Sequence, residues 1–115
     1  MNTEIKLQHS AGKQLRGILA DLGFATSQEI EAKLDDARVD VLVRADLKDA
    51  EILFVVEVKS RITPQTAPSV CQQLARSSSR AIPLMFAPVI SPRVAEIARS
   101  KNIGLVTIYL AHLDL

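Results

Sequence analysis

The stretch that decides the fold of this chain covers residues 38–60 and reads RVDVLVRADLKDAEILFVVEVKS. In residues 38–44 three valines alternate with other residues and would share one face, which predicts a half-buried strand. Residues 51–59 are apolar on both faces until Glu57, as expected of a central strand that is covered on each side. The polar residues 46–50 lie between the two strands and predict a turn. The two strands should therefore form a hairpin.

The turn of this hairpin sets which residues lie opposite one another. A loop centred on residues 48–49 places Val41 opposite Val56, and Asp40 opposite Glu57. Directly opposed residues have Cβ atoms about 4.5–5.5 Å apart, so two carboxylates there repel each other unless a cation lies between them. Because the turn lacks Asn-Gly or Gly-Gly, a shifted register that places the two acids diagonally also stays open.

Hydrophobic spacing outside the hairpin predicts three helices and three further strands. Ser91-Pro92 marks the start of the third helix, because a hydroxyl cap followed by proline is a typical helix start. The expected elements are a helix that begins between Thr3 and Ser10 and ends at Gly23, a short strand at 24–30, the two hairpin strands, a helix at 67–78, a buried strand within 82–90, a helix at 91–102 and a strand at 104–110. The order α-β-β-β-α-β-α-β predicts a mixed α/β class.

The composition of the 115 residues predicts one aromatic-poor domain, residues 1–115, with an ordinary hydrophobic share of 48%. Cys71 is the single cysteine and there are two histidines, which excludes an intramolecular disulfide and a zinc finger. The scattered glycines form no phosphate-binding loop, which argues against a nucleotide cofactor. No apolar run is long enough for a membrane helix and the N-terminus lacks a signal-peptide pattern. We therefore expect a cytoplasmic protein without membrane contact.

Charge is divided unevenly along the chain. Residues 1–60 carry 8 basic and 11 acidic side chains, whereas residues 61–115 carry 6 basic and 2 acidic ones. The basic half suits phosphate contacts, but its cations would also fit solvated helix faces, and the charges alone leave both interpretations open. The six basic residues are Arg61, Arg76, Arg80, Arg93, Arg99 and Lys101.

The end of the second hairpin strand carries residues suited to metal-assisted chemistry. Glu57 and Lys59 share a face, because side chains two residues apart on a strand point the same way. Mg²⁺ (or Mn²⁺) is bound by carboxylate, carbonyl and water oxygens, so Asp40, Glu57 and the backbone carbonyl of Val58 are the predicted metal ligands. Lys59 would orient or deprotonate the attacking water, or stabilise charge that develops on a scissile phosphate.

Each of these residues also has a purely structural interpretation. Glu57 and Lys59 would then form a local ion pair at an exposed strand end, and Asp40 would be an acid that faces solvent. Cys71 lies on the apolar face of the second predicted helix, so we interpret it as a buried structural thiol without chemistry.

At these residues the sequence resembles the PD-(D/E)XK nucleases, a family of restriction-endonuclease-like fold that includes Holliday-junction resolvases and many DNA repair nucleases. Val39-Asp40 stands for the PD part of the motif, and Glu57-Val58-Lys59 stands for the (D/E)XK part. The resemblance covers most of the chain and implies a restriction-endonuclease-like mixed sheet.

The resemblance also implies roles for individual residues. Asp40 and Glu57 would bind the metal and Lys59 would assist the water. Gln72 and Gln73 of the second predicted helix would lie near the site.

The chain departs from the family pattern in its first helix. Many members carry a Glu there, where this chain offers Lys13 and Gln14. Glu4, Glu29 and Glu31 are the candidates for the missing acid.

The sequence therefore predicts a Mg²⁺-dependent endonuclease that hydrolyses phosphodiester bonds in DNA, with Asp40, Glu57 and Lys59 as catalytic residues. The predicted nucleic-acid contacts are Arg61, Gln73, Arg76 and Arg80.

Cleavage of both strands of a duplex would need two sites, which predicts a homodimer with Tyr109 and Leu110 at its interface. The alternative function is a catalytically inactive domain of the same fold that binds nucleic acid or another protein. A plain α/β structural domain is the third possibility, and it predicts neither metal binding nor DNA binding.

Overall fold

A mixed β-sheet forms the centre of the computed structural model, which describes residues 3–76, 80–107 and 109–110. Along the chain the elements are α1 (Thr3–Asp21), β1 (Ala25–Leu34), β2 (Ala37–Leu47), β3 (Ala50–Val58), α2 (Ala67–Ala75), β4 (Ile82–Phe86), β5 (Val89–Ile90), α3 (Pro92–Ser100), β6 (Gly104–Val106) and β7 (Tyr109–Leu110). The five-stranded sheet has the order β1-β2-β3-β4-β6, antiparallel from β1 to β3 and parallel from β3 to β6. The observed order confirms the predicted α/β fold.

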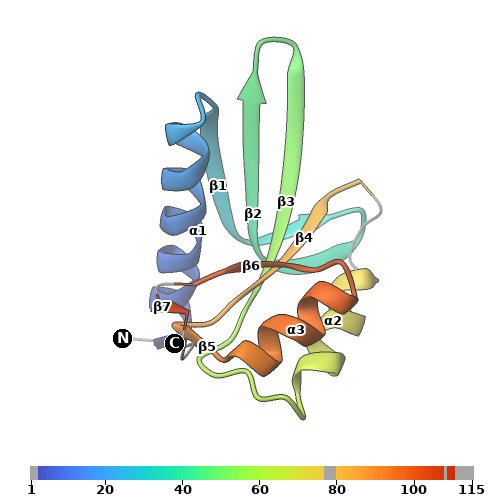
Figure 1. The fold of residues 1–115 in the computed structure, drawn as a ribbon. Coiled ribbons are helices and arrows are strands. Elements are labelled where there is room, and N and C mark those ends of the chain that lie inside the picture. The colour runs from blue at the N-terminus through green and yellow to red at the C-terminus, as the bar shows by residue number, and fades with distance from the viewer. Residues whose placement is uncertain (1–2, 77–79, 108, 111–115) are drawn as a thin grey trace.

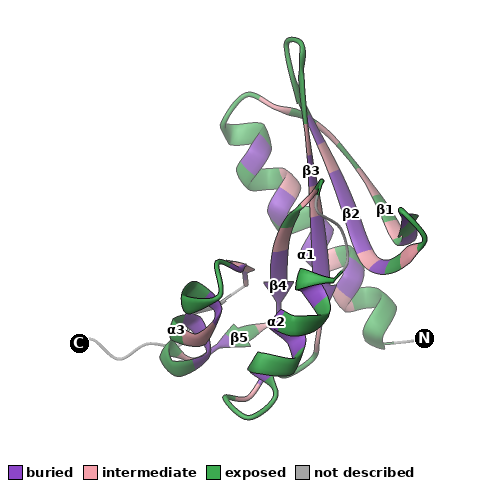
Figure 2. Ribbon diagram, turned by 90° about the vertical axis from the view of Figure 1, so that its right-hand side faces the viewer, coloured by how far each residue is buried: buried purple, intermediate pink, exposed green. Residues whose placement is uncertain are grey.

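Helices cover both faces of this sheet (Figure 1). α1 packs along β1, β2 and β3 on one face, and α2 and α3 pack together on the other. Figure 2 shows that buried residues follow β2, β3 and β4 and the inner sides of the helices. Within the described ranges, none of the helices is both long and apolar enough to cross a membrane.

The face under α1 holds one of two apolar clusters. Small residues let α1 approach closely: a Cβ atom on Gly12 would lie 2.4 Å from Oε1 of Gln28 on β1. α1 ends before Gly23, whose φ of +96° is one that glycine adopts without strain. The buried members of this cluster are Ala11, Leu15, Leu19, Val41, Val43, Ala45, Val56, Val58, Leu84, Phe86 and Val106.

The opposite face holds the second cluster, between the sheet and α2 and α3. Burial of its apolar side chains stabilises the fold by about 25 cal/mol per Å² removed from water. Its sheet residues include Leu42, Leu53, Val55 and Met85, and its helix residues include Val70, Cys71, Leu74, Val94 and Ala98. The prediction that Cys71 is a buried thiol is confirmed.

The β2–β3 hairpin has the register that the loop at residues 48–49 predicts. Val41 pairs with Val56, and the ladder runs to Leu47 and Ala50. Lys48 adopts a φ of +56°, as the first central residue of a tight hairpin turn does. The shifted registers are therefore excluded.

The predicted common face of the three valines is wrong for Val39. The side chain of Val41 packs in the cluster under α1, whereas that of Val39 packs in the cluster on the α2 and α3 side. The ladder between β1 and β2 lacks a pair at Glu31 and Asp40, and Glu31 has a φ of +51°. This local kink moves Val39 to the other face, which strict strand alternation cannot anticipate.

Element lengths differ from the predictions in three places. β1 is longer than the predicted 24–30 because it pairs along nearly all of β2 while its polar side chains face solvent. α2 ends at Ala75 with Arg76 as its C-terminal cap, and residues 77–78 of its predicted end lie outside the described residues. α3 ends at Ser100, before the predicted residue 102.

The two predicted strands near the C-terminus are each interrupted. Residues 82–90 divide into β4 and β5, because Pro88 has no N–H to donate to a ladder. In this gap the carbonyl oxygen of Ala87 accepts a hydrogen bond from the hydroxyl of Thr107 at 2.7 Å. β7 pairs with β5 in a separate parallel two-stranded sheet. Dimerisation through Tyr109 and Leu110 stays a prediction.

The cap of α3 gives a test of local folding. The Ser91 hydroxyl accepts the N–H of Val94 at 3.2 Å. We expect Ser91→Ala to lower the free energy of unfolding by about 1 kcal/mol in urea titrations, because this N–H loses its acceptor. Ser91→Asp keeps an acceptor and should stay close to wild type. Equal losses in both variants would contradict the role of the cap.

Candidate functional site

The β2–β3 hairpin places the predicted acids at one end of the sheet. Glu57 is the penultimate residue of β3, and Asp40 lies near the start of β2. Glu57 is on the face opposite α1, because Val56 and Val58 point toward α1 and the residue between them points away. Asp40 lies where β2 kinks, and its carboxylate reaches the backbone of β3. Lys59 follows β3 directly. Asp40, Glu57 and Lys59 therefore meet, as predicted.

Asp40 is held by the backbone of β3. The N–H of Val58 donates to Oδ2 of Asp40 at 2.8 Å. The β2–β3 ladder ends at Val41 and Val56, one residue before the expected pairing of Asp40 with Glu57. The carboxylate of Asp40 therefore replaces a backbone acceptor for β3 at this point.

Glu57 is almost fully buried, with 7% of its surface exposed. Its Oε2 lies 3.4 Å from Nζ of Lys59, whose side chain is 42% exposed. Burial and then the negative charge of Asp40 raise the pKa of Glu57, and Lys59 offsets part of this rise. Glu57 is thus a desolvated acid with one half-exposed cationic partner.

Asp40 is desolvated in the same way. Burial raises its pKa, the hydrogen bond from Val58 and the charge of Lys59 offset part of the rise, and Glu4 and Glu31 add to it. Asp40 is half-buried and Glu57 is buried, and two neighbouring desolvated carboxylates disfavour their own negative charge. A divalent cation would relieve that cost. The donor set therefore fits a hard, oxygen-liganded ion.

The acids present limit how such an ion would be held. In residues 3–76, 80–107 and 109–110, no three side chains from His, Cys, Asp and Glu are grouped closely enough to hold a metal. Asp40 and Glu57, with a backbone carbonyl such as that of Val58, would supply few protein ligands. Mg²⁺ tolerates this because it keeps several of its own waters.

The residues that the first helix brings toward the site are not those expected there. Lys13 and Gln14 are exposed and line a shallow surface hollow on the outer side of α1. Glu4, in the first turn of α1, lies near enough to Asp40 to act on its charge, as does Glu31 on β1. Glu29 is exposed on β1 and pairs across the sheet with a core residue.

Gln8 is a residue of this region that the sequence interpretation missed. It is 4% exposed on α1, one turn after Glu4, and its Nε2 donates to Oε2 of Glu31 at 3.5 Å. A polar residue at a core position of an otherwise amphipathic helix was the only signal in the sequence.

A pocket beside the acids brings together part of the predicted nucleic-acid contacts. Lys59, Arg61 and Gln73 line it. Hydroxyl groups of Thr66 and Ser69 complete its polar lining. Cationic, amide and hydroxyl donors in one concave surface suit a phosphate group.

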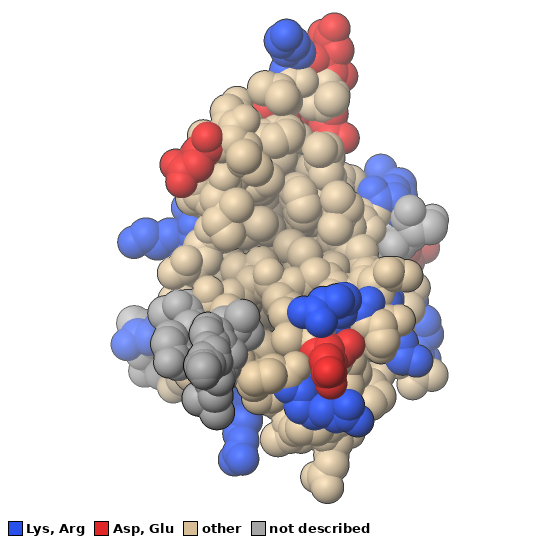
Figure 3. All heavy atoms as spheres, in the orientation of Figure 1, with Lys and Arg blue, Asp and Glu red and all other residues tan. Residues whose placement is uncertain are grey.

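The two remaining predicted contacts lie outside this pocket. Arg76 is exposed at the C-terminal cap of α2. Arg80 forms an ion pair with Asp35, with 3.0 Å between Nε and Oδ2, so much of its charge is already compensated. On the face seen in Figure 3, Lys and Arg side chains gather over α2 and α3.

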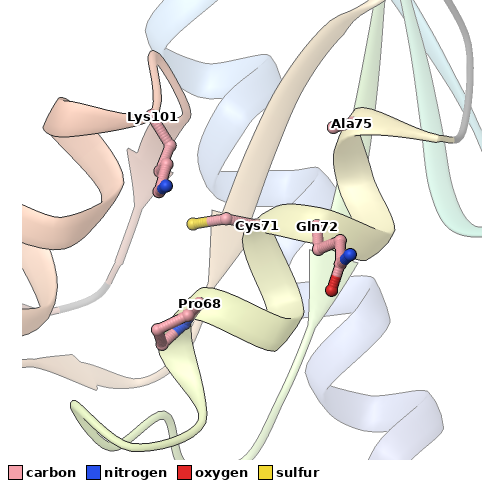
Figure 4. Close-up of a pocket in the computed structure, with 5 residues that line it drawn as sticks. All are labelled: Pro68, Cys71, Gln72, Ala75 and Lys101. Carbon is pink, nitrogen blue, oxygen red and sulfur yellow. The ribbon is translucent and has the colours of Figure 1, made fainter.

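A separate pocket lies between α2 and α3 (Figure 4). The thiol of Cys71 points from α2 toward the Lys101 side chain across this space. Burial raises the pKa of the Cys71 thiol, and Lys101 offsets this only in part. A thiol held in its protonated form is a poor nucleophile, which agrees with the interpretation of Cys71 as a structural thiol.

The arrangement of these elements is similar to that of two solved structures, one of them a restriction endonuclease. MspJI restriction endonuclease, in complex with a 27-mer oligonucleotide, matches with a TM-score of 0.66 and 14% sequence identity over 94% of this chain. The fold is restriction-endonuclease-like. The structure of AF1548, a protein of unknown function, matches with a TM-score of 0.55 and 16% identity over 92% of this chain.

The matches cover only part of each neighbouring chain. This chain corresponds to 26% of the MspJI chain and 58% of the AF1548 chain. No family model and no curated protein matches the sequence. The restriction-endonuclease-like fold is therefore shown by structure alone, and membership of the PD-(D/E)XK nucleases stays a prediction.

The charge of Glu57 should destabilise the metal-free protein. Because its pKa lies above the ordinary value of 4.5, this group favours folding most below that pH and disfavours it as the pH rises through the raised pKa. We expect Glu57→Gln to raise the free energy of unfolding at pH 7 by about 0.5–2 kcal/mol in the presence of a chelator. The gain should shrink toward zero below pH 4.5.

Glu51→Gln is the matched control for this measurement. Glu51 is half exposed and lies 3.9 Å from Arg44, so its removal should change stability by no more than about 0.5 kcal/mol. A Glu57→Gln variant that is less stable than wild type at pH 7 would show that the ion pair with Lys59 outweighs desolvation.

Proposed function

We propose that this chain is a metal-dependent nuclease that hydrolyses phosphodiester bonds in DNA with Mg²⁺ or Mn²⁺. The observation that carries the proposal is the pair of desolvated carboxylates, of buried Glu57 and half-buried Asp40, with the Lys59 ammonium 3.4 Å from Glu57. The restriction-endonuclease-like fold supports it, because it places the pair at a sheet end beside a polar pocket.

Asp40, Glu57 and a backbone carbonyl such as that of Val58 would hold the metal ion. When bound, the ion supplies Lewis acidity and lowers the pKa of a coordinated water. The hydrogen bond from the Val58 N–H fixes one carboxylate oxygen of Asp40, which orients the other oxygen. This preorganisation reduces the rearrangement needed when the ion binds.

Lys59 acts on the phosphate and on the water. Its side chain is half exposed, so its ammonium group can reach a substrate while it stays close to Glu57. In that position the ammonium stabilises negative charge on the scissile phosphate and orients the attacking water. Its charge also lowers the cost of keeping Glu57 ionised.

Arg61 and Gln73 would hold a phosphate of the DNA strand next to the scissile one. They line the same pocket as Lys59, which places them next to the reacting group. Arg76, and to a smaller degree the paired Arg80, would extend the contact along the backbone. The oligonucleotide in the MspJI complex supports DNA as the substrate class. Cleavage of both strands would require two copies of the chain.

A binding module without catalytic activity is the competing function. The lack of a three-acid group in the described residues favours it, because a weakly held ion would leave the site inactive. The two functions differ in turnover and share DNA binding.

Cleavage of labelled duplex, single-stranded and four-way-junction DNA with Mg²⁺ or Mn²⁺ tests the proposal. We expect metal-dependent cleavage that falls at least about 100-fold in Asp40→Asn, Glu57→Gln and Lys59→Met, because each removes a metal ligand or the cation at the phosphate. Lys48→Met, at the distant β2–β3 turn, should cleave like wild type. DNA binding without cleavage under either metal would favour the binding module.

The salt dependence of DNA binding tests the phosphate pocket. We expect Arg61→Gln to reduce the slope of log K against log[salt] by about 1, because one phosphate contact is lost. Arg44→Gln is the control, since Arg44 pairs with Glu51 on the far part of the hairpin. An unchanged slope in Arg61→Gln would show that Arg61 does not contact a phosphate of the DNA.

A further inference from the structure

The sheet is interrupted beside the candidate metal ligands. Ile30 pairs with Val41 and Ala32 pairs with Val39, but the two residues between them, Glu31 and Asp40, form no ladder pair. Glu31 has a φ of +51°, in the left-handed region that non-glycine residues seldom occupy. Such backbone strain is found most often at functional sites.

A buried amide of α1 fixes the side chain of Glu31. Nε2 of Gln8 donates to Oε2 of Glu31 at 3.5 Å. Only the amide nitrogen can donate to a carboxylate, so the amide oxygen of Gln8 must point elsewhere. That oxygen is buried and has no hydrogen-bond partner among the described residues.

The same face of α1 approaches Asp40. Glu4 lies one helical turn before Gln8, so the two side chains share a face. Glu4 and Glu31 both act on the charge of Asp40, which places this end of α1 and the kink of β1 around that carboxylate. Gln8 thus contacts Glu31, and Glu31 stands opposite Asp40 between the neighbouring pairs of β1 and β2.

Buried polar atoms are rarely left without a partner, and a missing partner commonly is an ordered water or an ion. An amide oxygen and a carboxylate accept hydrogen bonds, so both require a donor. Water bound to a divalent cation is a strong donor, and Mg²⁺ retains several such waters. The two acceptors therefore match the hydration shell of an ion held by Asp40.

We infer that Gln8 and Glu31 form an outer rim of the metal site, where they accept hydrogen bonds from waters of an ion bound at Asp40 and Glu57. This inference rests on the proposed metal-dependent function. Contact through water agrees with the lack of a three-acid group close enough to coordinate an ion directly in the described residues. In this chain, then, an amide of α1 and a carboxylate of β1 take part in holding the ion.

Calorimetric titration with MnCl₂ tests the inference without using cleavage as the readout. Gln8→Met removes both polar atoms at similar length, and Glu31→Gln removes the charge at an exposed position where folding should be preserved. We expect each to weaken Mn²⁺ binding about 10-fold or more, as loss of outer hydrogen-bond partners does at other metal sites. Glu29→Gln, two residues away on β1, should bind within twofold of wild type. Circular dichroism checks that each variant is folded.

The Asp40→Asn variant separates this inference from the proposed function. If Asp40→Asn abolishes Mn²⁺ binding while Gln8→Met and Glu31→Gln bind like wild type, the outer rim is wrong and the metal site stands. If Glu29→Gln weakens Mn²⁺ binding as much as Glu31→Gln does, the effect comes from the net charge of the protein and not from a specific contact. That result would also overturn the inference. A wild-type protein that binds no Mn²⁺ would overturn both proposals together.

Gln8→Glu gives a second, independent readout. A structural role for the amide alone predicts that this variant is less stable with or without metal, because the new carboxylate faces Glu31. A place on the outer rim predicts that the loss in thermal midpoint seen in chelator is recovered on addition of MnCl₂. A loss that persists in saturating MnCl₂ would contradict the inference.

Discussion

The hydrogen bond from the Val58 N–H to the Asp40 carboxylate connects the fold to the candidate site. At this point β3 still presents a donor toward β2, and a side chain accepts it in place of the backbone. β2 can therefore leave the regular ladder without leaving a buried N–H unpaired. That freedom lets the beginning of β2 cross to the α2 and α3 side, as the burial of Val39 there shows. One contact thus satisfies the sheet and fixes a carboxylate beside Glu57.

The cost of this arrangement is electrostatic. Asp40 and Glu57 both lie in surroundings that disfavour their charge, and Lys59, the cation that acts on both, is half exposed. The apolar clusters on the two faces of the sheet must offset the loss in free energy of unfolding that the two desolvated carboxylates cause. A site that costs stability within a fold that is otherwise stable is typical of places where a protein binds an ion or a substrate.

The sequence predicted the parts of the structure that depend on neighbouring residues. The turn at residues 48–49 determined the pairing of Val41 with Val56, and the periodic apolar residues of α1 and Ser91-Pro92 of α3 marked their helices. The meeting of Asp40, Glu57 and Lys59 was predicted from strand alternation and register, although the ladder ends one pair before Asp40 and Glu57 and a hydrogen bond from Val58 holds Asp40 instead.

Other features depend on contacts that no local pattern encodes. The side switch of Val39 comes from a kink shared by two strands, and the approach of Glu4 and Gln8 to Asp40 comes from how α1 lies on the sheet. Lys13 and Gln14 were considered for the first-helix position because of their place in the chain, and both face solvent. The predicted strand at 82–90 is divided into β4 and β5 because Pro88 lacks an N–H, and the continuous apolar run around it gives no sign of this break.

The division of the sheet into an antiparallel and a parallel half has a consequence for the order of assembly. β1, β2 and β3 follow one another directly, so their pairing closes only short loops, whereas β4 and β6 join across intervening helices. Contacts between residues close in sequence form with the smaller entropic cost. Both acids of the site belong to the early-closing half. The charged centre would therefore exist in the nascent protein before α2 and α3 enclose it, while water can still screen its repulsion.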